Sequence, residues 1–159
     1  MSAPASGGVV VGVSPTTGSP QALRWAAGEA RLRAAPLRAV MAWRPPRPPA
    51  VAGTRPPAGL TQAGTDAAAE AEQALREFVA QALGADSLTP PAAGGVHCEV
   101  VRGSAVTALL TSARDAQLLV IGEPRAGRVS NVRTTLVAPQ VMLRANCPVV
   151  AMPRAVGTA

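Results

Sequence analysis

Two short apolar runs, one near each end of the chain, most constrain how it can fold. The first run is Val9–Val13, followed by Ser14, and the second is Leu118–Ile121, followed by Gly122. Short, continuous runs rich in β-branched residues are typical of parallel strands that are buried on both faces. Each run carries a glycine at its carboxyl end, which is where an open α/β sheet places its ligand crevice. The two runs therefore predict an α/β domain with a site for a small anionic ligand.

The rest of the chain alternates between strand-like and helix-like patterns. Ser19-Pro20 predicts a helix start, because serine caps the helix and proline suits its first position. Alternation of this kind indicates a parallel sheet with right-handed crossovers. We expect strands at 9–13, 37–43, 96–102, 118–121 and 148–152, and helices at 20–35, from 65 to 83, from 105 onward, and through 141–143.

The length of 159 residues suits a single domain with a core that needs no disulfide or metal. We place the domain at residues 8–154, between tails at 1–7 and 155–159. Residues 44–60 hold six prolines and two glycines. We interpret 44–64 as a proline-rich surface loop, an insertion in preference to a lid.

Composition excludes several classes of partner. The chain carries a net charge of +6, but its arginines are scattered and aromatic residues make up only 2%. A solvated surface is therefore favoured over a nucleic-acid surface with stacking aromatics. We find no signal peptide and no apolar run of about 20 residues that could span a bilayer. Cys98 and Cys147 are interpreted as buried, reduced thiols, and we expect a cytoplasmic protein without membrane contact.

Several stretches, in their order and spacing, resemble the universal stress protein family across nearly the whole chain. They are Val9–Val13, Ala22–Ala26 with Glu29-Ala30, Leu37–Pro45, Val101–Ser104, Leu118–Gly122, Val141–Arg144 and Cys147–Val150. The resemblance implies a single-domain, three-layer α/β/α fold with a five-stranded parallel sheet in the order 3-2-1-4-5. This architecture is Rossmann-like and similar to the adenine nucleotide alpha hydrolase-like folds.

The resemblance also implies a homodimer joined through the last strand. In one branch of the family it implies ATP bound at the carboxyl ends of strands one and four. Those two strands flank the point where the strand order reverses, so the general behaviour of open α/β sheets agrees with this placement.

The chain departs from the pattern of ATP-binding members at several positions. Their acidic residue at the end of strand one falls at Ser14, whose hydroxyl lacks the charge-assisted strength of a carboxylate. In the loop after strand four, Gly122 and Gly127 are kept, whereas the middle glycine falls at Arg125. Pro124 removes one backbone N–H that could have held a phosphate.

The Gly-Ser pair that would receive the phosphates falls at Thr134-Thr135 or one residue later, in either case without its glycine. The threonine hydroxyls and the guanidinium of Arg125 can still donate hydrogen bonds to phosphate. The residues that we expect to contact a ligand are Gly12, Ser14, Gly122, Arg125, Gly127, Thr134 and Thr135.

We therefore expect a degenerate nucleotide site. Three occupancies stay open, namely ATP, a weaker or different anion, and none. The predicted function is a dimeric regulatory binding module in the stress response, acting through an unidentified protein partner. The alternatives are an ATP-binding or slowly ATP-hydrolysing protein, in which Glu123 alone is placed to act as base, and a structural dimer with a collapsed crevice.

Neither a catalytic group nor a metal site is predicted. His97 and Cys98 are neighbours in a strand, so their side chains point to opposite faces and cannot form a nucleophile pair. His97 is the sole histidine, and the two cysteines lie far apart, which leaves no ligand set for a metal. Trp43 ends a strand near the crevice, and we favour a core role for it over an adenine contact.

Overall fold

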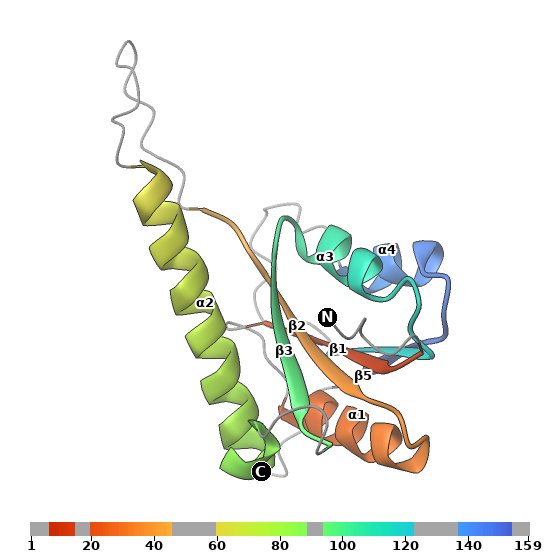
Figure 1. Cartoon of the computed structure of the whole chain (residues 1–159). Coiled ribbons are helices and arrows are strands. Elements are labelled where there is room, and N and C mark those ends of the chain that lie inside the picture. The colour runs from red at the N-terminus through yellow and green to blue at the C-terminus, as the bar shows by residue number, and fades with distance from the viewer. Residues whose placement is uncertain (1–6, 15–19, 46–59, 89–93, 123–136, 154–159) are drawn as a thin grey trace, which may run out of the picture.

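The computed structural model of the chain describes residues 7–14, 20–45, 60–88, 94–122 and 137–153. Strands and helices alternate along these residues, as the sequence predicts (Figure 1). The elements are β1 (Val9–Val13), α1 (Pro20–Leu32), β2 (Leu37–Trp43), α2 (Leu60–Leu83), the 3₁₀ turn η1 (Ala85–Leu88), β3 (Val96–Arg102), α3 (Ala105–Ser112), β4 (Leu118–Gly122), α4 (Val137–Arg144) and β5 (Val149–Met152).

The five strands form one parallel sheet in the order β3-β2-β1-β4-β5, which confirms the order implied by the resemblance. β1 is central, and its first three residues pair with β2 on one side and with β4 on the other. A central strand with helices on both faces has no side that meets water. This explains why Val9, Val10 and Val11 follow one another without a polar residue.

Helices cover both faces of the sheet and complete three layers (Figure 1). α1 and α2 lie on one side, where Val9, Val11 and Val13 join their core. α3 and α4 lie on the other side, where Val10 packs with side chains of these two helices. Alternate residues of β1 therefore pack into two separate hydrophobic cores, because successive side chains of a strand point to opposite faces.

The amino end of β1 is closed by backbone contacts. Val9 N–H donates to Pro36 O over 2.9 Å, and Gln117 N–H donates to Gly8 O over 2.9 Å. A Cβ on Gly8 would lie only 2.7 Å from Pro36 O, so the turn before β2 leaves room for glycine alone. The sheet is tightly joined at this edge.

The helix α2 begins at Leu60, directly after the proline-rich segment, and not at residue 65. The predicted loop over 44–64 is therefore wrong at its last five positions, because a glycine such as Gly64 inside a helix costs only about 1 kcal/mol and does not end it. Residues 46–59 of that loop lie outside the described residues, as do the predicted tails 1–7 and 155–159, Gly7 excepted.

α2 is longer than the sheet that it covers. Its 24 residues span about 36 Å at 1.5 Å per residue, whereas the seven residues of β3 span about 23 Å. The amino-terminal part of α2 consequently projects past the carboxyl ends of β2 and β3 (Figure 1). None of the helices in the described ranges is both long enough and apolar enough to cross a membrane.

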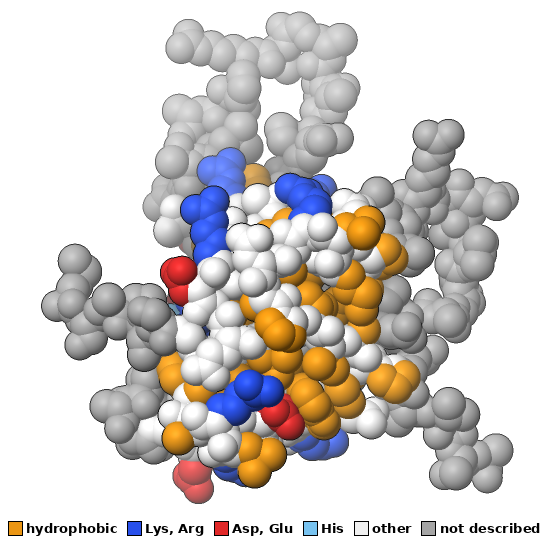
Figure 2. All heavy atoms as spheres, turned by 90° about the vertical axis from the view of Figure 1, so that its right-hand side faces the viewer, with side chains coloured by type: hydrophobic (Ala, Val, Ile, Leu, Met, Phe, Trp, Pro, Cys, Tyr) orange, Lys and Arg blue, Asp and Glu red, His pale blue; other side chains and the backbone are white. Residues whose placement is uncertain are grey.

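The two edge strands of the sheet differ in character. β3 carries His97, Glu99 and Arg102 at alternating or terminal positions, whereas β5 reads Val-Val-Ala-Met. All four side chains of β5 are half-buried, and beside them on α4 the exposed fractions of Met142 and Leu143 are 48% and 86%. Apolar side chains gather on this side of the molecule (Figure 2). We call these six residues, 142, 143 and 149–152, the β5 patch.

Candidate functional site

The carboxyl ends of β1 and β4 lie next to each other at the centre of the sheet, as predicted. Their pairing runs from Val9–Leu118 to Val11–Val120 and includes no later pair of described residues. The outer pairings continue further, to Val13–Met41 between β1 and β2 and to Gly122–Met152 between β4 and β5. The last two residues of β1 therefore pair only with β2, and the last two residues of β4 pair only with β5. The pairing between β1 and β4 has ended by then. An open α/β sheet forms its ligand crevice at this kind of point.

Gly12 lies within this region and is closely packed on the α3 side. A Cβ at Gly12 would lie 2.9 Å from Leu109 Cδ2, 3.3 Å from Leu109 Cδ1 and 3.6 Å from Ile121 Cγ2. Leu109 is a core residue of α3, with only 6% of its surface exposed. Gly12 therefore makes room for an aliphatic side chain, which is a common reason for glycine within a strand.

Ser14 and Gly122 lie at the same carboxyl edge of the sheet. Ser14 follows the last residue of β1 and is half-buried, and Gly122 is the last residue of β4 and is also half-buried. The structure thus brings Gly12, Ser14 and Gly122 together at one edge of the sheet. The other four expected contact residues, Arg125, Gly127, Thr134 and Thr135, lie outside the described residues.

A second set of contacts joins β2 and β3 at the same edge. Gly103 N–H donates to Trp43 O over 2.9 Å, and Arg44 Nε donates to Gly103 O over 3.4 Å. Ser104 then caps α3, because its hydroxyl accepts a hydrogen bond of 3.1 Å from Thr107 N–H. Trp43 is half-buried at the end of β2. These contacts join the start of α3 to the ends of β2 and β3 at the carboxyl edge of the sheet.

The remaining reactive groups show no arrangement for catalysis. His97 is exposed, whereas Cys98 packs against the core on the α1/α2 side. Burial raises the pKa of the Cys98 thiol, an effect that Arg76 partly opposes and Glu72 reinforces, so the thiol stays protonated near neutral pH. Burial raises the pKa of Cys147 as well. Among the described residues, no group of His, Cys, Asp or Glu could hold a metal ion.

Two features at the end of α3, the contact of Arg38 and the buried hydroxyl of Ser112, were not predicted from the sequence. The guanidinium of Arg38 donates to the carbonyl oxygen of Ser112 at the end of α3 and lies 3.9 Å from a carboxylate oxygen of Glu99. A positive charge next to the carboxyl terminus of a helix stabilises the helix through its dipole. The Ser112 hydroxyl is buried and, within the described chain, has no hydrogen-bond partner. The role of Leu109 was also missed, although a glycine inside a β-branched run hints at a close approach.

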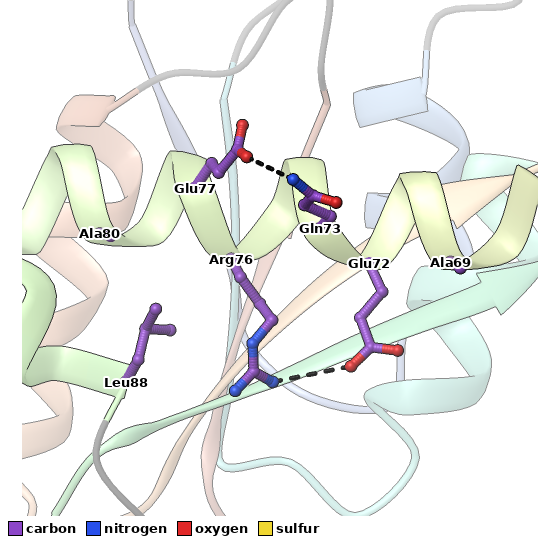
Figure 3. Close-up of a pocket in the computed structure, with 7 residues that line it drawn as sticks. All are labelled: Ala69, Glu72, Gln73, Arg76, Glu77, Ala80 and Leu88. Carbon is purple, nitrogen blue, oxygen red and sulfur yellow. Dashed lines mark hydrogen bonds and ion pairs between the residues drawn. The ribbon is translucent and has the colours of Figure 1, made fainter.

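A hollow of about 410 Å³ lies on the flank of α2, beside Leu88 of η1 and away from the crevice (Figure 3). Its charged and polar side chains are already paired within the helix. Arg76 Nη1 lies 3.6 Å from Glu72 Oε1, and Gln73 Nε2 donates to Glu77 Oε1 over 2.9 Å. The close-up shows both pairs along one helix, with Ala69 and Ala80 on the same stretch. We assign no function to this hollow.

Comparison with known proteins identifies the family. A model described as the universal stress protein family matches residues 7–153 of this chain. The chain is 32% identical over 152 residues to universal stress protein Rv2623 of Mycobacterium tuberculosis (strain ATCC 25618 / H37Rv), covering 90% of this chain and 46% of that protein. It thus spans about half the length of the curated relatives that it matches.

Solved structures share the fold. Universal stress protein UspA from Lactobacillus plantarum aligns with a TM-score of 0.58 and 21% identity, covering 92% of this chain and 97% of that one. A universal stress protein crystallised in complex with cAMP aligns with a TM-score of 0.55 and 21% identity, covering 93% and 97%. Both likenesses concern the arrangement of strands and helices.

Proposed function

The chain belongs to the universal stress protein family, and from that premise we propose that it is a regulatory binding module whose β1–β4 crevice takes an adenine nucleotide weakly. The observation that carries the proposal is the end of the β1–β4 ladder at Val11–Val120 while the outer ladders continue. A structural neighbour with the same fold was crystallised with cAMP, which supports an adenine nucleotide as the ligand class.

Weak binding follows from the residues at the crevice. Ser14 offers a neutral hydroxyl where ATP-binding members of the family have a carboxylate. A hydrogen bond to a charged group contributes about 1.5–3 kcal/mol, compared with about 0.5–1.5 kcal/mol between neutral groups. The difference of about 1 kcal/mol corresponds to roughly a fivefold loss of affinity. Pro124 removes one backbone N–H that could have held a phosphate, and Arg125 stands where ATP-binding members have a glycine.

Isothermal titration calorimetry of the purified chain with ATP and with cAMP tests this proposal. We expect weak binding to the wild type and about fivefold tighter ATP binding by Ser14→Asp, because the carboxylate strengthens the contact to ribose or base. Gln117→Glu is the matched control, since it adds the same charge at an exposed position at the amino end of β4. Absence of binding at millimolar nucleotide in the wild type and in Ser14→Asp would reject the proposal.

We propose that the module acts by binding and not by catalysis. At the carboxyl ends of β1 and β4, the described residues are Ser14, two glycines and aliphatic side chains, and none of these is a usual general base near neutral pH. Glu123 is the one acidic residue that the sequence places next to the crevice. We expect phosphate release from ATP to be no faster for the wild type than for Glu123→Ala. A clear excess in the wild type would favour a slow ATP hydrolase.

We further propose that two copies associate through the β5 patch. β5 is an edge strand with one paired side, and it carries no charged side chain to discourage strand addition. Leu143 and Met142 extend its apolar surface onto α4. Association would continue the sheet across the two copies, and nucleotide occupancy would alter which protein the dimer binds.

Sedimentation velocity tests the association. Leu143→Glu should convert the dimer to monomer at micromolar concentration, because it places a charge in an apolar interface while costing the monomer little at an exposed position. Leu32→Glu is the control, since this leucine is similarly exposed, at 83%, but lies at the end of α1. Monomeric wild-type protein, or equal loss in both variants, would count against the β5 patch.

A further inference from the structure

The two helices on one side of the sheet, α1 and α2, carry exposed stripes of opposite charge. Each stripe has a charged residue, a small residue and a second charged residue, at intervals of four and then three positions. The stripes are Arg24, Gly28 and Arg31 on α1, and Glu70, Ala74 and Glu77 on α2. Residues at this spacing share one face of a helix, so each stripe is about 10 Å long. We call them the α1 stripe and the α2 stripe.

The two stripes do not neutralise each other within one chain. The four charged side chains are exposed. Arg24 Nε donates to Ala82 O over 3.0 Å, in the last turn of α2 and beyond the α2 stripe. Glu77 Oε1 accepts a hydrogen bond of 2.9 Å from Gln73 Nε2 of its own helix. The ion pairs found among the described residues include no member of either stripe. Two complementary rows of charge thus lie on the surface of the same molecule.

The glycine of the α1 stripe is not required by packing within its own chain. A Cβ at Gly28 would meet nothing within 4 Å, whereas a Cβ at Gly8 or Gly12 would lie less than 3.0 Å from a neighbour. Glycine inside a helix is destabilising relative to alanine. The distance between packed helices depends on the side chains at their contact, so Gly28 lets a second helix come close to α1. Ala74, exposed in the middle of the α2 stripe, does the same for α2.

We infer that the α1 stripe of one copy of this chain packs against the α2 stripe of a second copy. The arginines and glutamates pair at both ends of the contact, and Gly28 and Ala74 let the helices approach between them. The chain itself carries both complementary stripes at equal spacing, which is why the occupant is a second copy. An exposed ion pair contributes little alone, so the contact is weak. It lies on the α1/α2 side of the sheet, apart from the β5 patch and the β1–β4 crevice.

Sedimentation velocity with charge-reversed variants tests the inference. Every chain carries Leu143→Glu, so that the proposed contact through the β5 patch does not contribute, and the chain with this change alone is the parent. One variant adds Glu70→Arg and Glu77→Arg, and the other adds Arg24→Glu and Arg31→Glu. Each variant alone should associate at least about tenfold more weakly than the parent, because attraction at both ends becomes repulsion. An equimolar mixture should regain the affinity of the parent within about threefold, because the two stripes are again opposite in sign.

A steric variant tests the close approach of the helices. Gly28→Leu adds bulk between the two arginines and leaves every charge in place. It should weaken association at least about tenfold, and circular dichroism should show it folded, because the added side chain has open space within its own chain. Association equal to that of the parent would contradict the packing of α1 on α2.

Asp86→Arg combined with Asp115→Arg is the matched control. It changes the net charge as much as the double reversal on α2, at two exposed positions outside both stripes. All measurements use about 100 µM protein in about 0.1 M salt, where charges more than about 10 Å apart are largely screened. The inference is overturned if the parent is monomeric under these conditions, if the control weakens association as much as the stripe variants do, or if the mixture associates no better than its components.

Discussion

The two ends of the central strand β1 contrast in how they use glycine. At the amino end, a Cβ on Gly8 would meet the carbonyl oxygen of Pro36 at 2.7 Å. At the carboxyl end, a Cβ on Gly12 would meet the tip of the Leu109 side chain at 2.9 Å. The first neighbour is backbone that hydrogen bonds hold in place, and the second is a side chain that can change rotamer. A substitution is therefore harder to accommodate at Gly8 than at Gly12, which lies near the proposed crevice.

Gly8→Ala should have the largest effect. Adding a methyl group against a fixed carbonyl forces the backbone to move, and we expect the free energy of unfolding to fall by about 3 kcal/mol. Urea denaturation followed by circular dichroism measures the change. Gly28→Ala is the control, because a Cβ there has open space within α1 and alanine favours the helix by up to about 1 kcal/mol. A loss below about 1 kcal/mol for Gly8→Ala would remove the contrast.

Gly12→Ala should have a smaller effect that depends on Leu109. The new methyl group displaces the leucine tip, and we expect a loss of about 1 kcal/mol in the free energy of unfolding. In a Leu109→Ala background the same change should be neutral or slightly stabilising, because the methyl group then enters a cavity. A double-mutant cycle from urea denaturation measures this coupling. If the two substitutions have additive effects on the free energy of unfolding, the side chain of Leu109 is not what restricts residue 12 to glycine.

A pair of serines sharpens the comparison further. Ser112 ends α3 beside the amino edge of the sheet with its hydroxyl buried and unpaired in the described structure, so Ser112→Ala should raise the free energy of unfolding by up to about 1 kcal/mol. The same variant should leave nucleotide affinity unchanged. Ser14→Ala, at the end of β1, should instead weaken ATP binding a few-fold. Calorimetry and urea denaturation of both variants distinguish the two outcomes, and a reversed pattern would contradict the assignment of the crevice.

The smallest expected effect concerns Cys98, which lies near the amino end of β3. Burial raises the pKa of its thiol, so folding favours the protonated form. The resulting stabilisation is complete below the unfolded thiol pKa of about 8.5 and is lost as the pH rises through the folded value. The free energy of unfolding should therefore decline as the pH rises above about 8.5. Cys98→Ala should flatten this decline, and an identical slope in the variant would assign the decline to other groups.

Sequence patterns predicted most of the strands because they are short segments rich in apolar residues and bounded by Pro, Gly or a polar residue. β2 and β3 begin and end where the pattern places them. The predicted start of α2 at residue 65 was too late, because the helix begins at Leu60 and runs through Gly64 without a break. The turn η1 was not predicted either.

The candidate site was predictable in its position but not in its lining. The adjacency of Gly12 and Gly122 follows from strand order, which a parallel α/β pattern strongly limits. The contact between Gly12 and Leu109 joins residues 97 positions apart, and no local pattern specifies which leucine of α3 fills the space. The bond from Arg38 to the end of α3 is equally non-local, because it depends on how the helix lies across β2.

The projecting amino-terminal part of α2 makes the β3 and β5 sides of the sheet's carboxyl edge differ. On the β3 side of the carboxyl edge, the amino-terminal part of α2 projects past the strands. None of the described helices does so on the β5 side (Figure 1). If a protein partner reads out the proposed binding at the β1–β4 edge, the projecting turns of α2 restrict its approach from the β3 side.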